Sequence, residues 1–140
     1  MILASASPSF AHHSFAAYDS TKTLTLTATV EAFEWANPHA VIRMLVQDNA
    51  PDAQAEWDVE TSSPSILQRF GWMRKSIKRG DRVMVVLNPM RDGSHHGRLH
   101  TLTVLDTGLI LRTKLSGPQI SPARGEDGSA YIRRGIRPAR

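Results

Sequence analysis

The chain has 140 residues, of which 41% are hydrophobic, so it can build one small core and a tail but not two domains. Cysteine is absent, which excludes a disulfide framework, a thiolate metal site and a cysteine nucleophile. The net charge of +4 comes from the end of the chain: residues 112–140 hold seven basic and two acidic residues, whereas residues 1–111 hold ten and eleven. The folded body is therefore nearly neutral, and we expect it to bind no nucleic acid.

Residues 1–11 resemble the last part of an export signal. They are rich in small residues, and Ser9-Phe10-Ala11 resembles a cleavage site, but they contain no basic n-region. We expect them to be the remnant of a signal whose true start lies upstream, so that a mature periplasmic protein begins at His12. The alternative is a disordered N-terminus of a protein that is not exported. No stretch has the ~20 apolar residues of a membrane-spanning helix, so no transmembrane segment is predicted.

The first long pattern alternates threonine with aliphatic residues over residues 23–32, which predicts a half-buried strand. At Ala32-Phe33 the phase of this alternation changes, which predicts a bulge or sharp bend. Asn37-Pro38 then predicts a turn, and His39 opens the next apolar run, over residues 40–46.

The following elements have clear boundaries in the sequence. Residues 56–61 alternate carboxylates with Trp57 and Val59, which predicts a strand with one core face and one solvated face. Ser63-Pro64 predicts the N-cap and first turn of a short helix that ends near Gly71. We expect the helix to bury Ile66, Leu67 and Phe70, and two more strands to follow over residues 82–87 and 98–105.

Three strands, a short helix and two strands, with a long bent first strand, are the order of a five-stranded OB-like barrel. We therefore predict an all-β, β-rich domain with one short helix over residues 12–111; an open α+β sheet is the alternative. Residues 112–140 are rich in Gly, Pro, Ser and Arg and have few apolar residues, so we expect a basic, disordered tail.

Several motifs of uncommon residues follow one another along residues 12–111. They are His12-His13-Ser14-Phe15, Glu34-Trp35-Ala36-Asn37-Pro38-His39-Ala40, Trp57-Asp58-Val59-Glu60, Ser63-Pro64, Gly71-Trp72 and Lys78-Arg79-Gly80-Asp81. In the order of these motifs the chain resembles DUF6152, a family of small exported bacterial proteins. The resemblance implies export to the periplasm and a small β-rich domain, and it implies no reaction. Two features depart from the family: residues 1–11 do not form the full leader expected of an exported protein, and the Arg-rich tail lies beyond the resemblance.

The six histidines are the strongest chemical signal, because neutral imidazole is a common ligand of copper, zinc and nickel. A mature N-terminal His12 would offer its α-amine and Nδ1 as a chelate, with His39 or His100 as a partner and His13 or Tyr18 nearby. This arrangement predicts a transition-metal site, with copper first among the metals. The alternative is that His12 and His13 are surface residues and that His39 only caps its turn.

A second candidate site consists of Glu34, Trp35, Asn37 and Trp57, which could frame a ligand groove. Core packing of the tryptophans and a solvated carboxylate face are the alternatives. No catalytic residue is predicted, because Ser14 and Ser63 lack a visible triad and no Gly-rich phosphate loop occurs.

The sequence thus predicts a periplasmic binding protein without catalytic activity. Its expected cofactor is copper, and its expected partner is either a protein whose identity the sequence does not indicate or a donor or acceptor of the metal. The alternative is an OB-like module that binds a protein or an oligosaccharide and no metal. An enzyme in which histidine-bound copper activates oxygen is a third interpretation.

Overall fold

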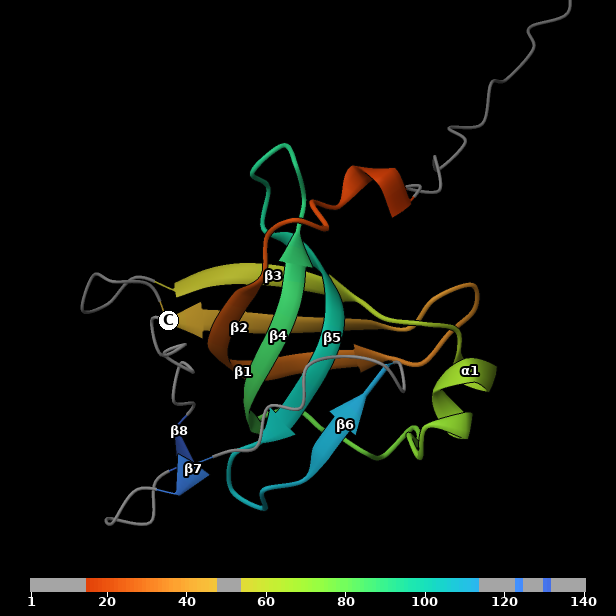
Figure 1. Cartoon of the computed structure of the whole chain (residues 1–140). Coiled ribbons are helices and arrows are strands. Elements are labelled where there is room, and N and C mark those ends of the chain that lie inside the picture. Colours follow the sequence, from red (N-terminus) through yellow and green to blue (C-terminus); the bar gives the residue numbers. More distant parts are fainter. Residues whose placement is uncertain (1–14, 48–53, 114–122, 125–129, 132–140) are drawn as a thin grey trace, which may run out of the picture.

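The computed structural model describes residues 15–47, 54–113, 123–124 and 130–131 (Figure 1). In this part of the chain, a 3-10 helix precedes three strands, a short α-helix follows them, and three strands complete the domain. The elements are η1 (Phe15–Ala17), β1 (Leu24–Glu34), β2 (Val41–Gln47), β3 (Gln54–Glu60), α1 (Pro64–Arg69), β4 (Arg82–Pro89), β5 (His96–Val104) and β6 (Ile110–Arg112).

The five strands from β1 through β5 pair with one another in a closed circuit and form a barrel. β1, β2 and β3 form an antiparallel meander, and β4 pairs antiparallel with both β1 and β5. β3 and β5 pair in parallel, with Val59 opposite Gly97 and Glu60 opposite Arg98, which completes the circuit. β6 adds to β5. The β-rich, OB-like barrel predicted from the order of the elements is confirmed.

The bend predicted in the first strand is present in β1. Val30 is opposite Met44 and Ala32 is opposite Arg43, so Glu31 is an extra residue and forms a bulge. Before the bulge β1 pairs with β4, and across and beyond it β1 pairs with β2. One long strand therefore serves both sides of the barrel, which allows so short a chain to close it.

Alternate side chains of the strands fill the barrel interior, as their period of two requires. Trp57 is 9% exposed, and α1 and the residues after it add Leu67, Trp72 and Ile77 to the core. The remaining core residues are Ala28, Val30, Ala40, Ile42, Met44, Val46, Val59, Val83, Val85, Leu87, Leu99, Leu102, Val104 and Leu111.

The short helix differs in two ways from its prediction. Ser63 occupies the N-cap position, but its hydroxyl lies 3.1 Å from that of Ser65 and does not cap the helix. Ile66 is 43% exposed, so its predicted burial is wrong. The helix has only six residues, and Gly71 at φ +84° turns the chain so that Trp72 fills the space next to Leu67.

The predicted signal remnant, residues 1–11, lies outside the described residues, as does most of the predicted tail, residues 112–140. Within that tail β7 (Ala123–Arg124) pairs antiparallel with β8 (Ala130–Tyr131) in a separate sheet. Of the helices in the described ranges, none has the length and hydropathy needed to cross a bilayer.

Candidate functional site

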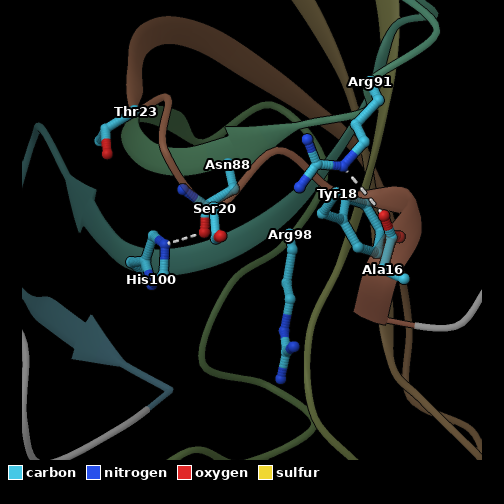
Figure 2. Close-up of a pocket in the computed structure, with 8 residues that line it drawn as sticks. All are labelled: Ala16, Tyr18, Ser20, Thr23, Asn88, Arg91, Arg98 and His100. Atoms are coloured by element: carbon cyan, nitrogen blue, oxygen red, sulfur yellow. Dashed lines mark hydrogen bonds between the residues drawn. The ribbon is translucent and has the colours of Figure 1, made fainter.

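A cavity of about 550 Å³ lies where residues 15–23, here called the N-terminal arm, cross the outside of β4 and β5 (Figure 2). The arm is held to the end of β4, because Tyr18 forms a β-bridge with Met90 and the Asp19 N–H donates to the Pro89 carbonyl at 2.8 Å. The cavity is lined by Ala16, Tyr18, Ser20, Thr23, Asn88, Arg91, Arg98 and His100.

The lining is polar and positively charged. The lining includes two arginines and one histidine. It also includes three side-chain hydroxyl groups and one side-chain amide, and no carboxylate belongs to the described lining. Guanidinium groups present several N–H donors in a plane that matches the oxygens of carboxylate and phosphate. The arrangement can therefore hold an anionic group.

Arg91 joins the cavity to the arm. Its Nε donates to the carbonyl oxygen of Ala16 at 3.0 Å, and its backbone N–H donates to the Ala17 carbonyl at 2.9 Å. Its Nη1 lies 3.7 Å from Oδ1 of Asp19. The Thr21 hydroxyl donates to the same Asp19 oxygen at 2.6 Å and is the main reason why the pKa of Asp19 is below its usual value. Asp19 therefore stays ionised beside Arg91 and helps to fix the arm.

Glu60, the last residue of β3, connects the arm to the turn between β1 and β2. The Tyr18 hydroxyl donates to its Oε2 at 2.7 Å, and its Oε1 pairs with Nδ1 of His39. Burial raises the pKa of Tyr18 above its ordinary value, and the hydrogen bond to Glu60 raises it further. The phenol therefore remains protonated and acts as the donor.

Arg98 lies directly opposite Glu60 in the β3–β5 pairing and extends beside Tyr18 (Figure 2). Burial lowers the pKa of its guanidinium, while the charge of Glu60 raises it. The guanidinium stays charged at neutral pH. A partly desolvated cation is thus held on the cavity wall.

His100 has a defined hydrogen-bonding role. The amide nitrogen of Asn88 donates to the Lys22 carbonyl at 2.6 Å, so Oδ1 of Asn88 faces Nε2 of His100 at 2.5 Å (Figure 2). Because an amide oxygen only accepts, Nε2 must carry the proton. The bond fixes the imidazole ring against β4.

The predicted metal ligands do not form a cluster among the described residues. His12 and His13 lie outside these residues. His39 pairs with Glu60 and His100 with Asn88, and within the described ranges no group of three or more histidine and acidic side chains could hold a metal ion. His95 instead stacks on Trp57, with ring centroids 5.1 Å apart.

The four predicted ligand-binding residues lie away from the cavity. Trp57 is in the core, and Trp35 is half-buried, with its ring 5.5 Å from that of Phe33. Asn37 is exposed, and its peptide bond to Pro38 is cis. Glu34 is also exposed and accepts a hydrogen bond from Arg43 at 3.0 Å on the outer face of the barrel.

Sequence reasoning did not single out Arg91 or Arg98. The available signal was weak: Arg98 alternates with Gly97 and Leu99 in a strand pattern, which indicates the outer face but not what it meets there. The arm supplies the other wall, and its position depends on contacts across some 70 residues, such as that between Ala16 and Arg91, 75 positions apart.

Comparison with known proteins assigns the family and no activity. No curated protein matches the chain, and no solved structure matches it. A family model described as a family of unknown function (DUF6152) matches residues 1–100, more than half of the chain. The chain belongs to DUF6152, as the order of its motifs predicted.

Proposed function

We propose that this protein is a small, non-catalytic binding module that holds an anionic small molecule in the cavity beneath the N-terminal arm. The observation that carries this proposal is the lining itself, in which Arg91, Arg98 and His100 are combined with hydroxyl and amide groups and no described carboxylate. The ligand class is a small carboxylate or phosphate compound, and an acidic sugar belongs to that class.

Electrostatics favours such a ligand. The Arg98 guanidinium is partly desolvated and faces the charge of Glu60, and an anion that enters the cavity would add a further charge-assisted hydrogen bond. The hydroxyl groups of Tyr18 and Ser20 and the imidazole of His100 would supply further donors and acceptors that orient the ligand.

The proposal is tested by calorimetric titration of the full-length protein with inorganic phosphate, citrate and glucuronate, and with glucose as a neutral control. We expect at least one anion to bind and glucose not to bind. Arg98→Gln should reduce the affinity about tenfold or more, since a hydrogen bond to a charged group contributes about 1.5–3 kcal/mol.

The matched control is Arg82→Gln, which makes the same charge change at an exposed position where β4 begins, whereas the arm crosses where β4 ends. It should leave affinity unchanged. Failure of all three anions to bind at millimolar concentration, or equal losses in the two variants, would refute the proposal.

A second candidate is transition-metal binding in the periplasm, with copper first. The observation that favours it is the pairing of Glu60 with Nδ1 of His39, because metal-binding histidines commonly donate their other ring nitrogen to a carboxylate. Nε2 of His39 would then be the metal ligand. The same carboxylate accepts a hydrogen bond from Tyr18, six positions after His12, and six residues span at most about 20 Å.

This candidate requires a mature chain whose first residue is His12, with a free α-amine. The test is a Cu(II) titration of protein recovered from the periplasm, with its N-terminus verified by intact mass. One bound Cu(II) that is lost on blocking the amine supports it, and His39→Ala should lower affinity by orders of magnitude. His96→Ala, at an exposed histidine, is the matched control. An uncleaved chain, or indifference to copper, would exclude it.

A further inference from the structure

The connection between β3 and β4 carries a charge unlike that of the rest of the domain. Residues 61–80, here called the basic connection, contain five basic and no acidic residues. The other residues before 112 contain five basic and eleven acidic residues. The basic members are Arg69, Arg74, Lys75, Lys78 and Arg79.

Two of these five charges are paired within the domain. Lys78 lies 2.9 Å from a carboxylate oxygen of Asp81, and Arg79 lies 2.9 Å from one of Glu31. Arg69, Arg74 and Lys75 are exposed, and no described acidic side chain is within ion-pair distance of them. These three cations are therefore available to an external partner.

The same connection exposes apolar side chains. Met73 is 66% exposed and Ile66 is 43% exposed, and they are two of the three large exposed apolar residues in the described part of the chain. Their neighbours Leu67 and Trp72 are buried.

The backbone around these exposed side chains is well fixed. The Trp72 N–H donates to the Leu67 carbonyl at 3.1 Å, and the Met73 N–H donates to the hydroxyl of Ser76 at 2.8 Å. The Trp72 indole also donates to the carbonyl of Arg112 at 2.8 Å. A firmly anchored segment thus presents isolated apolar side chains among unpaired cations.

We propose that the basic connection docks the domain onto the surface of an anionic lipid bilayer. Apolar side chains enter the boundary between headgroups and acyl chains while neighbouring cations contact anionic headgroups. Protein–protein interfaces are enriched in aromatic residues, methionine and arginine and depleted of lysine. The connection exposes Lys75 beside Met73, and none of the large apolar residues exposed in the described part of the chain is aromatic, which favours lipid over a folded protein partner.

The position of the connection in the fold suits this role. It leads into the start of β4, whereas the N-terminal arm is bonded to the end of β4 (Figure 1). Met73, Arg74 and Lys75 are not among the residues that line the cavity. This inference does not depend on the proposed function of the cavity.

The test is co-sedimentation of the full-length chain with vesicles of phosphatidylcholine alone and of phosphatidylcholine with phosphatidylglycerol, at low and physiological salt. We expect binding only to the anionic vesicles. The double variant Arg74→Gln with Lys75→Gln should weaken binding by about 25-fold, since each cation near the surface changes the affinity by about fivefold. Met73→Ser should weaken binding further at physiological salt.

The control double variant is Arg43→Gln with Arg82→Gln, which removes two exposed charges outside the connection. The basic tail is present in all variants, so their differences isolate the connection. No binding to anionic vesicles, or equal losses in the two double variants, would overturn the proposal. Tighter binding of an oligonucleotide or an acidic protein through the same residues would also overturn it.

Discussion

Replacing Tyr18 with phenylalanine tests whether the N-terminal arm is fixed as described. The change removes one hydroxyl group and keeps the aromatic ring. Tyr18 is only 6% exposed. The hydroxyl donates to Glu60 Oε2 at 2.7 Å, and a hydrogen bond to a charged acceptor contributes about 1.5–3 kcal/mol. Because the Glu60 side chain is 23% exposed, water can replace part of this bond, and we expect a loss of about 1–2 kcal/mol in the free energy of unfolding.

The assay is urea unfolding at neutral pH. The midpoint should fall while the dependence of the free energy on urea stays constant, since the folded surface is almost unchanged. Tyr131→Phe is the matched control, because β8 pairs with β7 in a sheet separate from the barrel. If Tyr18→Phe and Tyr131→Phe were equally stable, the bond between Tyr18 and Glu60 would contribute nothing, and the account of how the arm is held would be refuted.

The same tyrosine predicts how stability changes at alkaline pH. Its pKa in the folded state is raised above the ordinary value of 10.0, first by burial and then by Glu60. Below pH 10.0 the phenol is protonated in both the folded and the unfolded chain, so it does not change the free energy of unfolding. Above pH 10.0 the unfolded chain loses the proton first, so the free energy of unfolding falls as pH rises. Tyr18→Phe should remove this part of the alkaline loss, which urea midpoints at several pH values would reveal.

Three further changes follow from the packing and the charges. Gly97→Ala should cost about 1–3 kcal/mol by urea unfolding, because its Cβ would lie 2.7 Å from Cδ1 of the fully buried Leu87; no loss would mean that Leu87 can move aside. Trp57→Ala should cost about 3–5 kcal/mol as a core truncation, and a smaller loss would place the indole outside the core. The lowered pKa of Asp19 gives stability that is present above about pH 3.8 and lost as pH falls below it, and Thr21→Val should reduce this acid loss; identical acid titrations would contradict the role of Thr21.

The fold was predictable because its signals are local. The alternation over residues 23–32 gave a strand, its phase change marked the bulge at Glu31, and Gly71 marked the end of the helix. The burial of Trp57 follows from its alternation with carboxylates. The order of these elements was then sufficient to identify an OB-like barrel, because few topologies connect three strands, a helix and two strands in so short a chain.

The exposure of Ile66 could not be read from the helix alone. Its position beside Leu67 in an apolar run indicated burial. The helix has only six residues, however, and Leu67 and Trp72 are the residues there that join the core. Which of several adjacent apolar residues is left in water depends on the space that the barrel offers.

The candidate site shows the same division between local pattern and tertiary structure. By itself the sequence determined the order of strands and helix along the chain, the nearly neutral charge of the folded body and the high number of histidines. Only the tertiary structure brought the N-terminal arm against β4 and β5, paired Tyr18 and His39 with one carboxylate, and placed Arg91 and Arg98 around one cavity. Alternation along a strand states which face a side chain occupies, but the residues it meets on that face are set by how distant segments pack together.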